Sequence, residues 1–316
     1  MTTLVNRRGN ILVWVIGAAC IFPVEKLPAE TTETILIRQA LEKDRSGRRR
    51  GVVELVLSQY DGNRFVRYSA NGMIDPLGWR VRNETLTSYA DALGQDLRIY
   101  RYDIQRSVTL ISVRLDKAFV TTVDKGLVID RNSGAEQALD VTRLWTFRKE
   151  DDEWLVSALV DSLGDLATGP YTGAAGGVDE DIAMVLKAEA QAWNSGSAAG
   201  VIDHYDGEYV GYDAYHTILP ATWAITFNDA EEFEDWLDKR LSLTSYDVQR
   251  EILHASKGAG GLAAVALTRE KVTAKYRGGT AVHSQEGYAF WTLSRGGGSW
   301  KVTNLVQKLQ RPSAQE

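Results

Sequence analysis

The side chains best suited to acid–base chemistry lie in the second half of the chain. All four histidines are there, at His204, His216, His254 and His283, and histidine is the side chain that most readily changes charge near neutral pH. The stretch "HYDGEYVGYDAYH" (204–216) also places the carboxylate of Asp213 close to His216. Such a pair can act as base and donor, although an aspartate in such a stretch is more often a strand-end or turn residue. We expect His204 only to cap a helix end, and His254 and His283 to be exposed.

Other chemistries lack their residue patterns. The sequence has no histidine pair at zinc-ligand spacing, no Gly-x-x-x-x-Gly-Lys loop and no Gly-x-Ser-x-Gly turn. The net charge is −6, whereas a nucleic-acid binder normally carries a basic stripe. The one basic run, Arg48, Arg49 and Arg50, is predicted to be a solvated helix start beside a turn. We therefore predict no metal, no cofactor and no nucleic-acid partner.

The chain repeats itself. "YDIQR" (102–106) matches "YDVQR" (246–250), and "LWTFRKEDDEWLVSALV" (144–160) matches "FWTLSRGGGSWKVTNLV" (290–306). Equivalent residues are 144 to 146 positions apart, as in the pairs Tyr60/Tyr205, Tyr102/Tyr246 and Trp145/Trp291. A nearly constant offset of this size indicates a duplicated domain rather than a short solenoid repeat. Because the tryptophans and the YD(I/V)QR motif occur in both copies, we interpret them as parts of the shared fold.

The same elements are expected in both copies, and the second shows them clearly. Apolar residues at helical spacing predict a helix over 179–193, a short helix over 198–205 and a third helix over 228–241, capped by Asn228 or Asp229. An extended stretch lies at 208–215. Four long strands are predicted at the end of the copy, over 245–256, 262–276, 284–295 and 299–309, with Gly-rich turns between them. Helices followed by a run of antiparallel strands predict an α+β unit with helices on one sheet face.

Length and composition agree with this organisation. A chain of 316 residues, 44% hydrophobic and 25% charged, has the make-up of about two globular domains. A segment rich in Gly, Ala and Thr separates the two copies. The predicted organisation is a signal peptide or membrane anchor (1–29), a first domain (30–163), a Gly/Ala-rich linker (164–177), a second domain (178–311) and a tail (312–316).

The order of elements, with "FWTLSRGGGSWKV" as the last hairpin, resembles the SnoaL-like branch of the nuclear-transport-factor-2-like superfamily. The resemblance covers 30–163 and 178–311. It implies two cone-shaped units, each with a strongly bent antiparallel sheet around its N-terminal helices and an apolar pocket inside. The superfamily includes isomerases, dehydratases, epoxide hydrolases, polyketide cyclases and binding modules without catalysis, so the resemblance alone leaves the function open.

The resemblance also implies a place for a general base. In the ketosteroid-isomerase relatives a base aspartate follows the aromatic residue that ends the second helix by eight positions, and eight positions beyond Tyr205 is Asp213. The first copy has Ser69 at the equivalent position. Tyr205, His216 or Asn304 could donate to an oxyanion, with Tyr215 and Trp223 near the same pocket. We therefore expect the working pocket in the second copy.

The first copy offers a secondary candidate. "MIDPLGW" (73–79) places Asp75 before a proline and Trp79 shortly after it. Aspartate before proline is typical of a turn. The motif also resembles the Asp-Pro where the isomerase pocket closes, so Asp75 and Trp79 remain candidate ligand contacts.

The first residues predict export. Arg7 and Arg8 precede a short apolar stretch and then Pro23, which is the layout of a secretory signal peptide and is short for a spanning helix. A retained membrane anchor over 11–24, or lipidation at Cys20, the chain's one cysteine, are the alternatives. We expect a periplasmic or secreted protein that contacts a membrane only through this segment.

Two functions remain. One is an exported protein that binds a small apolar molecule or a partner without catalysis. The other is an isomerase, dehydratase or cyclase that uses Asp213 as its base. In either case the two sheets could pair as an internal pseudo-dimer, or pair with other copies in a homo-oligomer.

Overall fold

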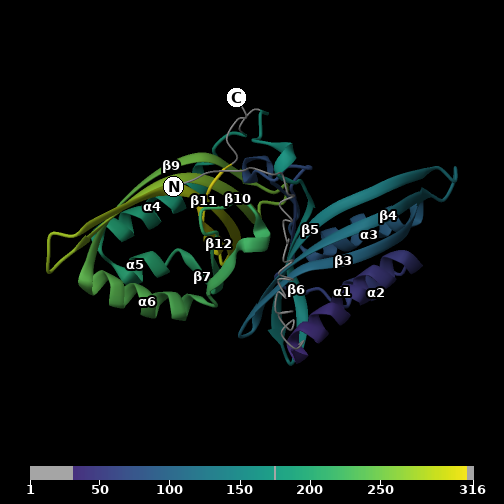
Figure 1. Cartoon of the computed structure of the whole chain (residues 1–316), viewed down its shortest axis with the longest axis horizontal. Coiled ribbons are helices and arrows are strands. Elements are labelled where there is room, and N and C mark those ends of the chain that lie inside the picture. Colours follow the sequence, from purple (N-terminus) through teal and green to yellow (C-terminus); the bar gives the residue numbers. More distant parts are fainter. Residues whose placement is uncertain (1–30, 174–175, 312–316) are drawn as a thin grey trace, which may run out of the picture. The chain divides into compact units, whose positions relative to one another are not determined.

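The computed structural model describes residues 31–173 and 176–311. Residues Thr32–Glu316 form one compact unit, in which two similar sets of elements follow each other along the chain (Figure 1). We call α1 to β6 the first repeat and α4 to β12 the second repeat. The predicted signal segment lies outside the described residues.

The elements of the first repeat are α1 (Thr32–Arg50), α2 (Val53–Leu57), β1 (Val66–Ser69), β2 (Arg80–Asn83), α3 (Leu86–Ile99), β3 (Tyr100–Arg114), β4 (Lys117–Asp130), β5 (Glu136–Glu150) and β6 (Glu153–Leu163). Those of the second are α4 (Glu180–Ser195), α5 (Ala198–Ile202), β7 (Tyr205–Asp213), β8 (Ala224–Phe227), α6 (Ala230–Leu243), β9 (Thr244–Lys257), β10 (Ala263–Tyr276), β11 (Val282–Gly296) and β12 (Ser299–Leu309). Three short 3-10 turns complete the description: η1 (Pro76–Gly78), η2 (Leu166–Thr168) and η3 (Pro220–Thr222).

Each repeat has one six-stranded sheet, with the order β2-β1-β6-β5-β4-β3 in the first and β8-β7-β12-β11-β10-β9 in the second. The four long strands pair antiparallel, as the hairpin pattern predicts. The prediction of an antiparallel sheet was wrong for one pair of strands in each repeat, because β1 pairs parallel with β6 and β7 pairs parallel with β12. The chain reaches β7 from a helix rather than a hairpin, so a tight turn does not set the direction of this strand.

The register shows which residues of the two repeats are equivalent. Ser69 lies opposite Asp161, and Asp213 lies opposite Gln307, at the end of the matching parallel pair. Ser69 and Asp213 therefore occupy the same position, as the sequence comparison predicted.

Local signals explain the helix ends. The side chain of Asp179 accepts from the backbone N–H of Asp181 and Ile182 and begins α4, and Gly196, in the left-handed region at φ 72°, ends it. Asp229 caps α6 by accepting from the N–H of Glu232, which confirms one of the two predicted caps.

The helices cover one face of each sheet and enclose a core there. Trp145 and Trp291 are 0% and 1% exposed, and Trp154 and Trp300 are also buried. The prediction that these repeated tryptophans fill the core is confirmed. Trp145 and Trp154 belong to the buried cluster of the first repeat, which also contains Tyr60. Trp291 and Trp300 belong to that of the second repeat, which also contains Phe233.

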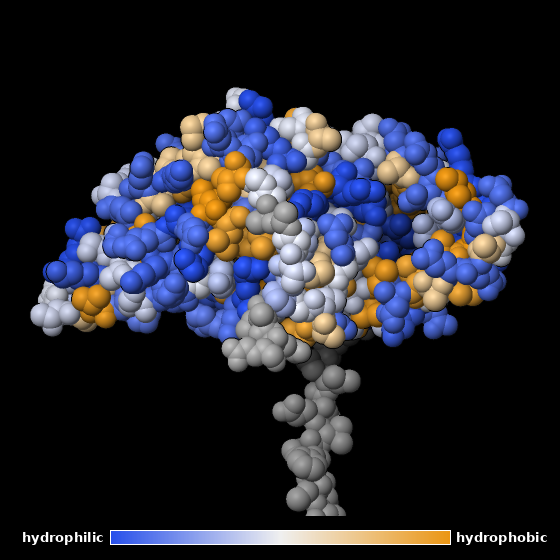
Figure 2. Space-filling model, turned by 90° about the horizontal axis from the view of Figure 1, so that it is seen from above, coloured by the Kyte–Doolittle hydropathy of each residue, from blue (hydrophilic) through white to orange (hydrophobic). Residues whose placement is uncertain are grey.

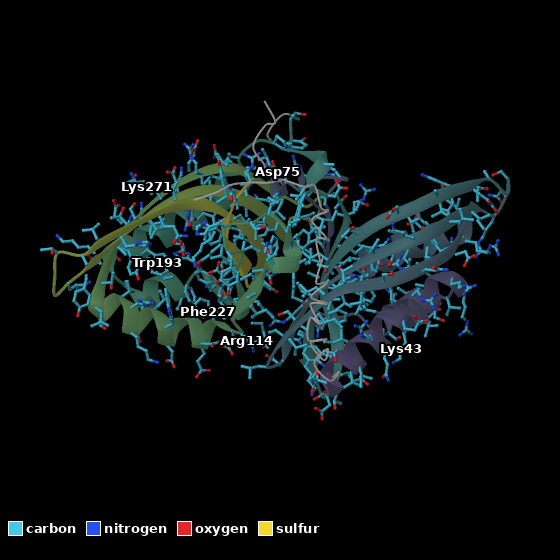
Figure 3. All side chains as sticks on the ribbon, viewed as in Figure 1. Lys43, Asp75, Arg114, Trp193, Phe227 and Lys271 are labelled. Atoms are coloured by element: carbon cyan, nitrogen blue, oxygen red, sulfur yellow. The ribbon has the colours of Figure 1, made fainter. Side chains whose placement is uncertain are left out.

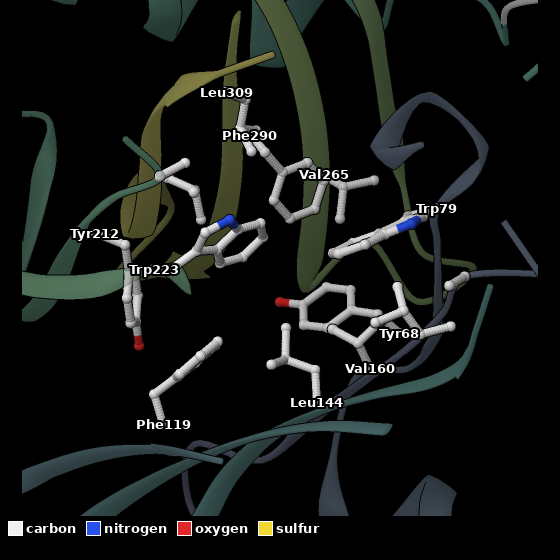
Figure 4. Packing of buried hydrophobic residues seen from close by; sticks show 14 of the residues in the cluster. Tyr68, Trp79, Phe119, Leu144, Val160, Tyr212, Trp223, Val265, Phe290 and Leu309 are labelled. Carbon is white, nitrogen blue, oxygen red and sulfur yellow. The ribbon is translucent and has the colours of Figure 1, made fainter. Parts of the chain in front are cut away.

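A further cluster of buried residues contains side chains of both sheets (Figure 4). Phe119 of β4 stacks on Trp223 with ring centroids 5.9 Å apart, and Trp79 meets Phe290 edge-on at 4.9 Å. On the face shown in Figure 2, hydrophilic residues cover most of the surface and apolar residues lie among them in groups. Within the described ranges, no helix has the length and apolar character needed to cross a membrane.

Candidate ligand-binding site

The second repeat contains a cavity of about 470 Å³ between its sheet and its helices. Residues of α4, β7, β8, α6 and the four long strands line it. Its size falls within the range of small-molecule sites, which are mostly apolar with a few placed polar groups. We therefore take this cavity as the candidate site.

Aromatic side chains form much of the wall: Trp193, Phe227, Phe233, Trp236, Tyr246, Tyr288 and Trp291. Trp193 stands in the last turn of α4, and its ring centroid is 5.1 Å from that of Tyr246 and 6.2 Å from that of Trp236. Trp193 and Phe227 lie within the second repeat in Figure 3. Phe233 and Trp236, three residues apart on α6, face the same side of the helix. The wall thus presents flat apolar surfaces to an occupant.

Three charged residues lie together on the wall. Arg250 donates from Nε to Glu270 Oε1 at 2.6 Å and from Nη1 to Glu189 Oε2 at 2.6 Å. Its guanidinium lies 4.4 Å from the ring centroid of Trp291. Burial disfavours the charge of Arg250, but the two carboxylates hold its pKa above the ordinary value. Arg250 therefore remains a cation shared by two anions.

Glu189 is held from three directions. Besides Arg250, Tyr205 Oη donates to Glu189 Oε1 at 2.7 Å and Trp193 Nε1 donates to the same oxygen at 2.8 Å. Burial and the nearby Glu189 carboxylate raise the pKa of Tyr205 well above its ordinary value, so its hydroxyl remains a donor. The candidate Tyr205 thus supports a wall residue.

Asp213 lines the cavity. Its Oδ1 accepts from the N–H of Tyr215 at 2.8 Å, and its Oδ2 accepts from Lys308 Nζ, which also lines the cavity. The Asp213 residue is 8% exposed. A base at this place would have to release an ion pair before it could take a proton.

Two other candidates lie just beyond Asp213 and point elsewhere. Tyr215 and His216 both have positive φ, at 50° and 61°, in the turn after β7. Tyr215 is 60% exposed, and His216 is also exposed, with its Nε2 3.5 Å from Nε2 of Gln285. Gln285 lines the cavity. His216 therefore contacts a residue of the cavity wall but does not line the cavity itself.

The remaining candidates are not brought to this cavity. Trp223 and Trp79 are buried in the cluster that contains side chains of both sheets. Asp75 is fully buried and accepts from Arg311, whose Nη2 is 2.6 Å from its Oδ2. Asn304 lines a different cavity, of about 410 Å³, and donates to Thr292 Oγ1 at 2.8 Å.

In the first repeat the equivalent interior holds a larger network of buried ion pairs. Arg106, equivalent to Arg250, lies 2.7 Å from Asp124 and 2.9 Å from Asp44. Arg48 also binds Asp44, at 3.0 Å. Arg143 joins Asp124 to Asp161.

This network corrects one prediction. Arg48 lies in the last turn of α1 and is 8% exposed, whereas the basic run was predicted to be solvated at a helix start. The buried carboxylate of Asp44, one helical turn earlier, draws the guanidinium inward. A second correction concerns His254, which was expected to be exposed. It is 1% exposed, with Nε2 3.0 Å from Ser256 Oγ, and burial lowers its pKa.

The sequence comparison missed the charged wall residues Glu189, Arg250 and Glu270. The sequence does contain a signal for them, because each matches a residue of like charge in the first copy at an offset of 144 to 146 positions. These residues are Asp44, Arg106 and Asp124. Arg250 was seen as part of the repeated motif but was interpreted as purely structural. Among the described residues, no group of three potential metal ligands is present.

No protein-family model and no curated protein matches the chain. Solved structures do match. They include a ketosteroid isomerase-like protein from Erwinia carotovora atroseptica (16% identity, TM-score 0.35, 42% of this chain and 95% of that one). An NTF-2 like protein of unknown function from Shewanella oneidensis matches at 17% identity and TM-score 0.32, over 41% and 98% of the two chains. A protein with a cystatin-like fold from Nostoc punctiforme matches at 12% identity and TM-score 0.33, over 43% and 93%. Each of these matches covers about the length of one repeat.

Proposed function

We propose that the second repeat binds a small, largely apolar molecule in its cavity, and that it does so without catalysis. The observation that carries the proposal is the aromatic wall around this cavity, at a place where the first repeat has two further buried arginines, Arg48 and Arg143. Burying the flat face of a ligand against these rings is favourable at roughly 25 cal/mol per Å² of apolar surface. Binding rather than turnover is supported by the pairing of each wall carboxylate with a cation or several donors.

The second candidate function is an enzyme of the isomerase, dehydratase or cyclase kind with Asp213 as base. The observation that favours it is that Asp213 lines the same cavity as the aromatic wall. A ligand that displaced Lys308 from Asp213 would free the carboxylate to accept a proton.

The cavity proposal is tested with the purified full chain by native mass spectrometry, looking for a co-purified small molecule. The matched pair of variants is Tyr246→Ala, which removes a wall residue, and Tyr102→Ala, its equivalent in the first repeat. We expect Tyr246→Ala to lose the bound mass and Tyr102→Ala to retain it. Loss in Tyr102→Ala alone would place the ligand in the first repeat and contradict the proposal.

We also propose that the chain is exported, on the support of Arg7, Arg8 and the short apolar stretch that follows them. N-terminal sequencing of the natively expressed protein is expected to start between residues 20 and 30. A soluble cytoplasmic protein that still begins at Met1 or Thr2 would rule this out.

The two repeats are further proposed to act as an internal pseudo-dimer. The support is the cluster in which Phe119 packs on Trp223 and Trp79 on Phe290 (Figure 4). Ion pairs such as Arg114–Glu232 and Arg311–Asp75 accompany it.

A further inference from the structure

Two interior carboxylates recur in both repeats, Asp44 as Glu189 and Asp124 as Glu270, but the cations that face them differ. Asp124 of β4 lies opposite Arg106 of β3, and Glu270 of β10 lies opposite Arg250 of β9. In the first repeat, however, Asp124 has a second cation. Arg143 of β5 donates to Asp124 from Nη1 and to Asp161 Oδ1 from Nε, the latter at 2.9 Å.

The second repeat lacks this second cation. Arg143 lies opposite Thr122, and the residue opposite the equivalent Thr268 is Ala289. The position of Asp161 is taken by Gln307. Glu270 and Gln307 both line the cavity. The second repeat therefore has cavity space between these two side chains, where Arg143 joins Asp124 and Asp161 in the first repeat.

A second difference between the repeats also removes a cation from the second repeat. Trp193 stands at the position of Arg48, and it donates a neutral N–H to Glu189 where Arg48 donates a charged group to Asp44. The described residues that line the cavity include three carboxylates, Glu189, Asp213 and Glu270, and two cations, Arg250 and Lys308. Lys308 pairs with Asp213, so one arginine serves the other two carboxylates.

The surroundings favour a cation as well. An aromatic face attracts positive charge, and the attraction grows when both partners are removed from water. Arg250 already uses the ring of Trp291 in this way, at 4.4 Å, while Trp193, Trp236 and Tyr246 contribute further rings to the cavity wall.

We propose that the ligand is an organic cation, in which a flat apolar body carries an amidinium, guanidinium or ammonium group. The body lies against the aromatic wall, and the cation donates to Glu270 and Gln307, where Arg143 donates to Asp124 and Asp161 in the first repeat. The inference depends on the proposed ligand-binding role of this cavity and adds the charge of the ligand. The first repeat supplies this cation from its own chain, and the second takes it from solution.

The test compares three probes of nearly equal shape on the full-length protein by calorimetry: benzamidine, which is a cation, benzamide, which is neutral, and benzoate, which is an anion. We expect benzamidine to bind at least about tenfold more tightly than benzamide, as a desolvated cation–aromatic and carboxylate contact implies. Benzoate should bind most weakly. If benzamide or benzoate binds as tightly as benzamidine and Tyr246→Ala removes that binding, the cation inference is overturned while the ligand-binding proposal stands. If none of the probes binds, and no molecule co-purifies, both fail.

Two variants locate the cation. Glu270→Gln should abolish the preference for benzamidine over benzamide, while Glu251→Gln, an exposed carboxylate on β9, should leave it unchanged. Ala289→Arg introduces a guanidinium at the position equivalent to Arg143, between Glu270 and Gln307. This variant should have a higher melting temperature and should no longer bind benzamidine. An Ala289→Arg protein that still binds benzamidine with wild-type affinity would overturn the proposed position of the cation.

Discussion

Replacing Arg143 with methionine tests whether the charged interior of the first repeat stabilises the protein. The Arg143 side chain is 8% exposed and binds Asp124, which is 0% exposed, and Asp161, which is 12% exposed. Removing one partner of a buried ion pair costs about 3–5 kcal/mol, because the other charge stays buried. Arg106 still holds Asp124 at 2.7 Å and Arg67 still holds Asp161 at 2.5 Å, so we expect a loss near the lower end, about 3 kcal/mol.

The pH dependence provides an independent check on the same variant. Burial opposes ionisation of Asp161, but the guanidinium groups of Arg143 and Arg67 hold its pKa below the ordinary value of 3.8. A carboxylate with a lowered pKa in the folded state stabilises the fold above its unfolded pKa, and this contribution is lost as the pH falls through the folded pKa. Arg143→Met raises the pKa of Asp161. The stability difference between wild type and variant should therefore be largest near neutral pH and shrink below about pH 4.

The assay is urea unfolding of the full chain at several pH values, followed by tryptophan fluorescence. The control is Lys125→Met on β4, which removes an ion pair with Asp140 that is 67% and 66% exposed and should cost less than about 1 kcal/mol. The reasoning is refuted if Arg143→Met is as stable as wild type at neutral pH, or if its deficit does not shrink in acid.

The remaining predictions concern the cavity and the independence of the repeats. Asp213→Asn should weaken ligand affinity only several-fold in titration calorimetry, because an amide still hydrogen-bonds. Ser69→Ala, at the equivalent position of the first repeat, should leave the affinity unchanged. Complete loss of a measured turnover in Asp213→Asn would instead support the enzyme. Gly211→Ala should lower the free energy of unfolding by about 1–3 kcal/mol, because its Cβ would lie 2.8 Å from Phe227 Cδ2 and from Tyr209 Oη. Gly207→Ala, with no atom within 4 Å, is the control for the same urea titration. A fragment of residues 178–316 should be soluble and melt cooperatively in calorimetry, since it holds a complete sheet with its own helices; aggregation beside a well-behaved full chain would indicate that the repeats need each other.

Much of the fold could be predicted from the sequence, because its signals are local or periodic. The offset between Tyr102 and Tyr246 indicated a duplication, and alternating apolar residues placed β12 at 299–309, as observed. Asp229 was predicted as one of two possible caps of α6 because a cap bonds within its own turn. The parallel pairing of β7 with β12 joins segments about 100 positions apart, and no local residue pattern specifies it.

The candidate site divides in the same way. Asp213 was a candidate because of the family resemblance, and its equivalence to Ser69 followed from matching the two copies. The two residues do occupy equivalent places in the register. The partners of these residues were decided only in three dimensions. Lys308, 95 positions after Asp213, reaches that carboxylate because β12 lies beside β7.

Tertiary structure also decided the meaning of the differences between the copies. In the sequence, Arg143 and Ala289 are one difference among many, and Arg48 belongs to a basic run that looks solvated. Folding places both arginines against buried carboxylates. Because an unpaired buried charge is costly, replacing either arginine would lower the stability of the fold. The amino-acid sequence by itself determined two copies of one fold, with their helices, strands and repeated charges. Only the packing determined that these charges form a buried network in one copy and line a cavity in the other, because such contacts join strands that are distant in the sequence.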